Sequence, residues 1–475
     1  MKHENIVLSI VVLGTIMASI DSTIVLLAFP AMTQALNSNI ATMIWVILIY
    51  VLVTAVASMQ LGRVGDIYGR SRMFNLGFGL FTLASFFCGL APNDVLLIAS
   101  RGLQAFGGAL MSSNSGAIIA DTFERHRMGK AYGYTSLGWN VGATLGIVLG
   151  GVITTFLGYR YIFFINVPIG IVALYLGLKY IKDVNVVKER LDLRGMLVLG
   201  AGLTLLSLGG VYFASVGLDI SDAVLVAAGV LVILLFLALE RRTAMPVINH
   251  TLLKNRVFRN SILASLTQGL GYMGAVFLVI MYLQGVMGLD PLYASLLLIP
   301  GYVISSLLSP LMGRYSDKYG ARLIATTGLV FLIIALLVYL TLGVDSSVYV
   351  VIIGSIFAGF GGAMFWPANN SAVMASSDQR SYGSSSGLLR LSSGIGLLGS
   401  FVIVIAVAAA AIPRALAFQI FVSSSHISTA LADAFVAGMH VSIIALIVIL
   451  VISAFLSLTR GKEDRRAATH DKAGT

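Results

Sequence analysis

The stretch VVLGTIMASIDSTIVLLAFP, residues 11–30, decides the fold of this chain. It belongs to an uncharged run, residues 6–30, in which Asp21 is the only ionisable side chain. A run of this length can cross a bilayer, which needs roughly 20 residues. Asp21 is therefore expected near mid-depth, where a charge costs on the order of 2.5 to 3.5 kcal/mol, so we expect the chain to use it. The alternative is a neutral carboxyl tied to Ser22, Thr23 or a backbone carbonyl.

Composition extends this conclusion to the whole chain. Of the 475 residues, 58% are hydrophobic and only 11% are charged, whereas soluble domains carry about 25% charged residues. The N-terminus is short and the first apolar run is too long for the central segment of a signal peptide, so we interpret it as a span. Cys88 is the only cysteine, which excludes an internal disulfide and a cysteine-rich metal site. The composition predicts an all-α polytopic membrane protein.

Fourteen apolar segments follow one another along the chain. Of the 30 Lys and Arg residues, 26 lie in the two tails and the even-numbered loops, while only Arg160 and Arg414 lie on the opposite side. The positive-inside rule then predicts a multi-pass protein of the plasma membrane with both termini in the cytoplasm. The formal charge of +10 is balanced by anionic headgroups, so it requires no nucleic-acid partner. The predicted spans are 6–30, 42–62, 73–91, 95–120, 131–157, 161–181, 195–214, 222–239, 260–286, 291–312, 323–343, 347–372, 383–410 and 434–458.

Two motifs occur twice, which indicates an internal duplication. GRVGDIYGRSR at 62–72 recurs as GRYSDKYGARL at 313–323, and QAFGGALMSSN at 104–114 recurs as AGFGGAMFWPA at 358–368, with offsets of 251 and 254. Repeated halves with a central site are a transporter architecture. The predicted domains are a six-helix half (1–181, spans 1–6), a linker with the inserted spans 7 and 8 (182–259), a second six-helix half (260–458, spans 9–14) and a cytoplasmic tail (459–475).

Six motifs in order resemble the major facilitator superfamily, and within it the fourteen-span drug:proton antiporters of the QacA and EmrB type. The resemblance covers almost the whole chain and implies two six-helix halves plus two inserted helices. The motifs are IDSTIVLLAFP (20–30), GRVGDIYGRSR (62–72), SRGLQAFGGAL (100–110), YRYIFFINVPIG (159–170), ERRTAMPVINHTLLKNRVFRN (240–260) and YLQGVMGLDPLYASLLLIPG (282–301).

The repeated loop motif is the candidate gate. Its glycines, Gly62 and Gly69, are expected to permit a tight turn between two spans. Asp66 lies among arginines, in position for a charge cluster that can latch onto the other half. The resemblance implies that this cluster stabilises the outward-facing state, with a weaker twin in the second half; the alternative is a solvated turn. The gating candidates here are Gly62, Asp66, Gly69, Arg70, Arg72 and Asp317.

Span 4 carries the second intramembrane charge. Arg101, Gln104 and Ser112 fall on one helical stripe, which must face the bundle. Asp21 and Arg101 are the candidates for proton coupling, although Arg101 could instead be tied to backbone carbonyls. In the second half, the corresponding stripe has Ser355 in place of the arginine, and its aromatic and amide residues are expected to form a substrate wall or simply to pack. The substrate candidates are Gln104, Ser112, Trp139, Asn140, Gln268, Tyr272, Trp366, Asn369, Asn370 and Arg390.

Span 5 reads GYTSLGWNVGATLGIVLGG at 133–151 and places a glycine at every fourth residue from Gly138. Such a stripe lets another helix approach closely. It resembles the antiporter motif of the family, with Ile147 where that motif has proline. Arg390 in span 13 maps onto Asn140 and is the third buried charge, for which substrate contact and structural pairing both remain open. Three stripe residues join the gating candidates: Gly142, Gly146 and Gly150.

These patterns together predict secondary transport by alternating access. Asp21 would carry a proton and the transporter would export amphipathic organic compounds or drugs; a passive or differently coupled facilitator of lipids or solutes is the alternative. Five of the six histidines lie in tails or loops and no nucleotide-binding loop is present, so we do not expect an enzyme. We expect no metal and no cofactor. The expected partners are a small-molecule substrate, protons and membrane lipids, with the chain acting as a monomer.

Overall fold

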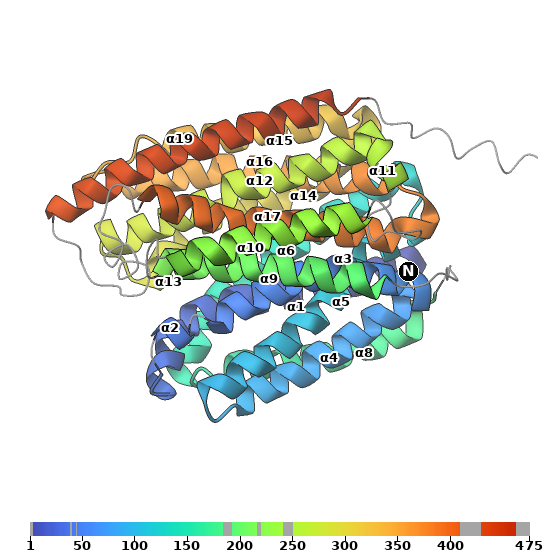
Figure 1. Cartoon of the computed structure of the whole chain (residues 1–475), viewed down its shortest axis with the longest axis horizontal. Helices are drawn as coiled ribbons and strands as arrows, with labels where there is room; N and C mark the ends of the chain where they lie inside the picture. The colour runs from blue at the N-terminus through green and yellow to red at the C-terminus, as the bar shows by residue number, and fades with distance from the viewer. Residues whose placement is uncertain are drawn as a thin grey trace, which may run out of the picture.

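The computed structural model describes residues 3–38, 40–43, 45–183, 192–215, 220–240, 250–408 and 429–461. Its long helices run side by side along the longest axis of the molecule (Figure 1). Within these ranges, eleven helices are long and apolar enough to cross a membrane. Long apolar stretches favour helices because a helix satisfies its own backbone hydrogen bonds in lipid. The chain is therefore a multi-pass, all-helical membrane protein.

The helices before the linker form the N-terminal half. The first predicted span is longer than expected, since it extends on both sides of residues 6–30 as one continuous helix. The sixth span is divided at Ile165 into two helices. The elements are α1 (His3–Ala35), α2 (Ile40–Met43), α3 (Trp45–Tyr68), α4 (Arg70–Leu90), α5 (Asp94–Thr122), η1 (Arg125–Arg127), α6 (Met128–Phe156), α7 (Tyr161–Phe164) and α8 (Asn166–Tyr180).

The helices after the linker form the C-terminal half. Phe365, Leu336 and Leu446 are completely buried members of its largest apolar cluster. The elements are α11 (His250–Lys254), α12 (Arg256–Met281), η2 (Tyr282–Val286), α13 (Pro291–Leu296), α14 (Ile299–Tyr319), α15 (Ala321–Tyr339), α16 (Val348–Ala375), η3 (Gln379–Ser381), α17 (Tyr382–Ala408) and α19 (Thr429–Thr459).

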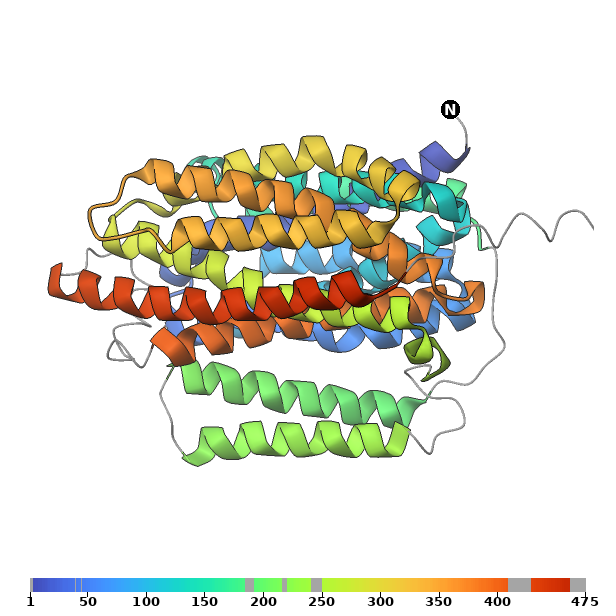
Figure 2. The same cartoon turned by 90° about the horizontal axis from the view of Figure 1, so that it is seen from above.

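Two further helices, α9 (Leu193–Ser215) and α10 (Ile220–Glu240), coincide with the predicted inserted pair. Figure 2 shows them, in green, as a layer along one side of the other helices. The helices α9, α10 and α17 cover the three predicted spans that are not among the eleven. The count of fourteen spans and the four domain boundaries stay predictions.

The turn between α3 and α4 corrects one expectation about the repeated motif. Gly69 has φ 108° and forms the turn, as Gly320 does with φ 90° in the second copy. The prediction that Gly62 also belongs to the turn was wrong, because α3 continues through it to Tyr68. A Cβ at Gly62 would lie 2.1 Å from the carbonyl oxygen of Gly383, so glycine is required there by contact with α17. The end of the bundle that carries Gly69 and Gly320 is called the turn end below.

The glycine stripe of α6 packs against α1. A Cβ at Gly142 would lie 2.6 Å from the carbonyl oxygen of Ile16, and one at Gly146 would lie 2.8 Å from that of Ile20. The predicted close approach is therefore between two helices of the same half. As gating candidates, Gly142, Gly146 and Gly150 lie along α1 and not between the halves.

Gly142→Ala is expected to lower the free energy of unfolding by about 1 to 3 kcal/mol, because the added methyl group pushes against the backbone of α1. Thermal unfolding in detergent measures the effect. Gly79→Ala is the matched control: it is also in a helix, and its Cβ would meet only Leu174, at 3.8 Å. The control should be neutral or slightly stabilising. Equal melting temperatures for both variants would contradict close packing of α1 on α6.

Candidate functional site

Asp21 lies in the middle of α1 and is completely buried. Its Oδ2 accepts a hydrogen bond from Arg101 Nη1 at 2.6 Å. Its Oδ1 accepts from Gln104 Nε2 at 2.8 Å and from Asn166 Nδ2 at 3.0 Å. A buried charge is tolerated when it is paired and its remaining lone pairs are bonded, and both conditions hold here. The structure thus brings together the two predicted proton-coupling residues, Asp21 and Arg101.

A second set of contacts fixes Arg101. Its Nη1 also donates to Gln104 Oε1 at 2.6 Å, and its Nε donates to the carbonyl oxygen of Val46 at 3.2 Å. The guanidinium lies 4.4 Å from the ring centroid of Tyr50, in cation–π geometry. Gln104 Nε2 donates in turn to Ser85 Oγ at 2.7 Å. The Asp21 network, as we call these side chains, lies wholly within the N-terminal half.

Several members of this network differ from the sequence prediction. Gln104 was predicted to contact substrate, and the structure instead ties both ends of its amide inside the network. Ser22 and Thr23, the alternative partners of Asp21, donate to the carbonyl oxygen of Ser19. Asn166 was missed, although it is the one amide in the apolar motif at 159–170. An isolated Asn in a span is a usable signal for a buried partner.

The first copy of the loop motif joins the halves at the turn end. Asp66, in the last turn of α3, accepts from the backbone N–H groups of Gly383 and Ser384, both at 2.8 Å, and from Ser384 Oγ at 2.9 Å. These donors belong to the first turn of α17, where the helix dipole also favours an anion. Asp66 is completely buried. A side chain of the N-terminal half therefore caps a helix of the C-terminal half.

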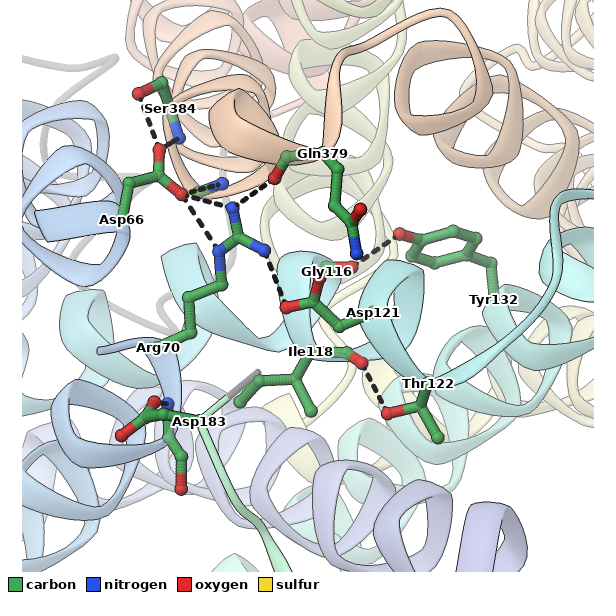
Figure 3. Close-up of polar contacts among 12 residues, drawn as sticks. Asp66, Arg70, Gly116, Ile118, Asp121, Thr122, Tyr132, Asp183, Gln379 and Ser384 are labelled. Carbon is green, nitrogen blue, oxygen red and sulfur yellow. Dashed lines mark hydrogen bonds and ion pairs between the residues drawn. The ribbon is translucent and has the colours of Figure 1, made fainter. Parts of the chain in front are cut away.

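Arg70 extends this contact into a charge cluster, drawn in Figure 3. Its Nη2 lies 2.7 Å from Asp66 Oδ1, and its Nη1 lies 2.6 Å from Asp121 Oδ2. The same Nη2 donates to the carbonyl oxygen of Gln379, just before α17, at 2.6 Å. Asp121, in the last turn of α5, thus joins the candidates. We call Asp66, Arg70 and Asp121 the first latch.

The second copy of the motif makes the reciprocal contact. Asp317 Oδ1 and Oδ2 accept from the backbone N–H groups of Gly129 and Lys130, both at 2.8 Å, in the first turn of α6. The backbones touch beside it, since a Cβ at Gly313 would lie 2.1 Å from the carbonyl oxygen of Gly129. We call Asp317 with these two donors the second latch. Both latches lie at the turn end and both join one half to the other.

Arg72 is a gating candidate that the structure does not bring into either latch. Its side chain is 77% exposed and its Nε lies 3.5 Å from Asp183 Oδ2. Asp183 Oδ1 accepts from the backbone N–H of Ser71, so this pair holds the start of α4 within the N-terminal half. A cavity of about 200 Å³ lies beside it, with Asp183, Arg70 and Asp121 among its walls. The first latch therefore borders a cavity at the turn end that is large enough for several water molecules.

The residues predicted to line the substrate site fall into two groups: some have polar atoms without a hydrogen bond, and others are already hydrogen-bonded within the protein. Among the described residues, Gln268 Oε1 and Asn370 Oδ1 are buried acceptors without a hydrogen bond. Tyr272 and Trp366 are partly buried at the edge of the C-terminal apolar cluster. Substrate contact by these four residues stays a prediction. Ser112 is partly buried and donates only to the carbonyl oxygen of Ala109, in its own helix.

Asn369 lies in a different environment. Its Nδ2 donates to the carbonyl oxygen of Ser261 at 3.1 Å, and its Oδ1 accepts from Arg460 Nη1 at 3.3 Å. Arg460 is completely buried and also donates to the carbonyl oxygen of Ala321. The predicted substrate role of Asn369 is therefore replaced by a tie between α16, α12 and the end of α19. Sequence counting placed Arg460 with the charged tail, so this buried cation was missed.

The remaining candidates lie where the halves meet or on α6. Asn140 Nδ2 donates to Ser305 Oγ of α14 at 2.9 Å, which is a contact between halves. Trp139, its neighbour, is 45% exposed. Arg390 is partly exposed on α17, and Tyr132 of α6 is the ionisable group beside it. Across the described ranges, no group of three or more His, Cys, Asp or Glu could hold a metal ion.

The sequence profile described as Major Facilitator Superfamily matches residues 11–401. The chain belongs to the major facilitator superfamily. This superfamily consists of membrane transporters, so the protein is a transporter and is not assigned as an enzyme. The resemblance seen in the loop and span 4 motifs is confirmed at this level. Assignment to the fourteen-span subfamily stays a prediction.

Comparison with individual superfamily proteins agrees with this assignment. The riboflavin transporter RibZ of Clostridioides difficile is 31% identical over 378 residues, which are 79% of this chain and 82% of RibZ. The multidrug resistance protein Stp of Mycobacterium tuberculosis is 30% identical over 401 residues, 84% of this chain and 74% of Stp. Among solved structures, the human organic anion transporter MFSD10 has a TM-score of 0.66 and 14% identity, over 96% of this chain and 99% of that one. The last comparison concerns the fold alone.

Proposed function

We propose that this superfamily protein is a proton-coupled secondary transporter that exports amphipathic organic compounds by alternating access, as the fourteen-span drug:proton antiporters do. The observation that carries the proposal is the Asp21–Arg101 pair, which is at most 2% exposed and is held at 2.6 Å. A charge pair at this depth is costly to keep for packing alone. Relatives named as multidrug resistance proteins, including Stp, support the choice of substrate class.

Protonation of Asp21 is the proposed coupling step. A proton on the carboxylate removes the charge that holds Arg101 and leaves the guanidinium with Gln104 and the Val46 carbonyl as acceptors. The network then has a second arrangement, in which α1 and α5 are joined less tightly. The membrane potential adds about 2.3 kcal/mol per charge per 100 mV to drive such an exchange. Release of the proton restores the pair and completes the cycle.

The two latches supply the proposed gate. Both hold the halves together at the turn end, which positive-inside counting assigns to the cytoplasm, so the described state would open to the opposite side. Opening toward the cytoplasm must break the Asp66 and Asp317 caps, and a substrate that favours one state shifts the equilibrium by its difference in affinity. The protein would act as a monomer with both termini in the cytoplasm.

Proteoliposomes with an imposed proton gradient test the proposal. Purified protein should accumulate amphipathic dyes or antibiotics against their gradient when the inside is acidic, in the direction that corresponds to export. Collapse of the gradient with an uncoupler should reduce this transport to simple equilibration. Equal accumulation with and without the gradient would instead identify a facilitator that needs no proton.

A further inference from the structure

The sequence predicts three charged side chains within the spans: Asp21, Arg101 and Arg390. Among the described residues, Arg390 is the one of these three that has no ion-pair partner. Asp21 and Arg101 neutralise each other at 2.6 Å within the N-terminal half. For Arg390, in contrast, no hydrogen bond or ion pair is formed with any other described residue, and Tyr132 is the one ionisable neighbour in electrostatic contact. A guanidinium has five N–H donors and always carries its charge. Its donors are therefore available to an acceptor from outside the chain.

The position of Arg390 on α17 places it where the halves meet. A Cβ at Gly387 would lie 2.6 Å from the carbonyl oxygen of Ser58, and one at Gly394 would lie 2.8 Å from the side chain of Ala55, both on α3. Arg390 is three residues after Gly387 and four before Gly394, so it lies on the same stripe of the helix. The stripe that packs on the N-terminal half thus carries a partly exposed cation two turns inside α17 from the turn end.

Among the described residues, Asp21, Asp66 and Asp121 are carboxylates within or at the ends of the N-terminal helices that already have cationic partners. Asp21 is completely buried and already accepts three hydrogen bonds. Asp66 and Asp121 both accept from Arg70. A cationic substrate would therefore have to displace an arginine, whereas an anionic one would meet an arginine that has no partner. Electrostatic complementarity favours the anion.

We propose that Arg390 binds an anionic group of the substrate, such as a carboxylate, sulfonate or phosphate, on a compound whose apolar body contacts partly buried aromatic residues such as Tyr272 and Trp366. This inference names the substrate class and rests on the proposed transport function. Arginine is suited to the task because its planar fork can make two parallel hydrogen bonds to one anionic group. The proposed substrate is therefore amphipathic and carries a negative charge.

Two dyes with the same xanthene ring and opposite charge test the inference. Carboxyfluorescein is anionic and rhodamine 123 is cationic, and fluorescence anisotropy with purified protein in nanodiscs gives the Kd of each. The parent protein should bind carboxyfluorescein at least about tenfold more tightly than rhodamine 123. A preference for the cationic dye, equal Kd values, or no binding of the anionic dye would overturn the proposal. This comparison needs no variant, so it stands whatever the variants do.

Arg390→Gln should raise the Kd of carboxyfluorescein by roughly tenfold or more and leave that of rhodamine 123 unchanged or lower. Arg390→Lys should keep much of the preference because it keeps the charge. Arg72→Gln, the same substitution at a 77% exposed position, is the matched control and should change neither Kd. An equal change for both dyes would mean that Arg390 supports packing. Because binding needs no proton gradient, failure of proton coupling in proteoliposomes would reject the proposed function and leave this inference standing.

Discussion

Gradient-driven transport is expected to be lost completely in Asp21→Asn. The amide cannot bind and release the coupled proton, so the exchange has no driving force. The substitution also leaves Arg101 at 2% exposure without an anionic partner. Removing one member of a buried pair costs about 3 to 5 kcal/mol, so the melting temperature should fall as well. A neutral amide is cheaper than a lone carboxylate within a membrane, but here it leaves the buried Arg101 guanidinium without its anion.

A double variant separates coupling from stability. Asp21→Asn with Arg101→Gln removes both charges and keeps side chains able to hydrogen-bond to Gln104 and Asn166, so it should recover most of the lost stability. It should still fail to accumulate substrate in proteoliposomes with an imposed proton gradient. Full gradient-driven transport by the double variant would show that the pair is structural. The search for the proton site would then move to Asp121.

Asp66→Asn is expected to slow transport at least about tenfold while leaving ligand affinity nearly intact. The carboxylate accepts from two backbone N–H groups, Ser384 Oγ and two nitrogens of Arg70, and an amide can serve only some of these donors. A loss of about 1.4 kcal/mol from the first latch shifts the balance between states tenfold. The turn end should then open more often.

Spin labels across the turn end measure this shift. Cysteines at Tyr68 and Arg380 place labels on exposed positions of the two halves, and the native Cys88 is completely buried. Pulsed electron spin resonance should find one short distance in the parent protein and an additional longer one in Asp66→Asn. Asp183→Asn is the control, because Asp183 accepts a backbone N–H within one half. Ligand affinity that falls as much as transport would mean that Asp66 supports the fold or the substrate site.

Adding Asp317→Asn should enlarge the longer-distance population further, because the second latch caps α6 as the first caps α17. If the two latches act independently, their effects on the free energy between states should add. The two aspartates lie 251 residues apart in the repeated motif, and their parallel contacts follow from that repetition.

The helices were largely predictable because bilayer thickness sets the length of each apolar run. The contact of the loop motif with the other half was also foreseen for Asp66 and Asp317. The helical setting of Gly62 was not, since a glycine inside a helix and one in a turn look alike until the close approach of Gly383 is known. Sequence spacing places residues on a helix face but does not say which neighbour that face meets.

The candidate site shows the same limit. Spacing placed Arg101 and Gln104 on one stripe, but only packing shows that both turn toward Asp21 and away from the contact between the halves. Asn166 and Arg460 are far in sequence from their partners, so their hydrogen bonds depend on how the helices are rotated. That Arg390 has no hydrogen-bond or ion-pair partner among the described residues could likewise be known only from the structure.

The inserted helix α9 has a consequence for how compounds arrive from within the bilayer. It packs against both α3 and α17, and Gly200 faces Val56 of α3, so it covers one seam between the halves. Among the described helices, neither α9 nor α10 makes a comparable contact with α6 or α14, which form the contact between the halves that Asn140 and Ser305 join. A lipophilic compound diffusing sideways in the membrane would therefore meet an inserted helix at one contact between the halves and none at the other. Lateral entry into this transporter would be one-sided.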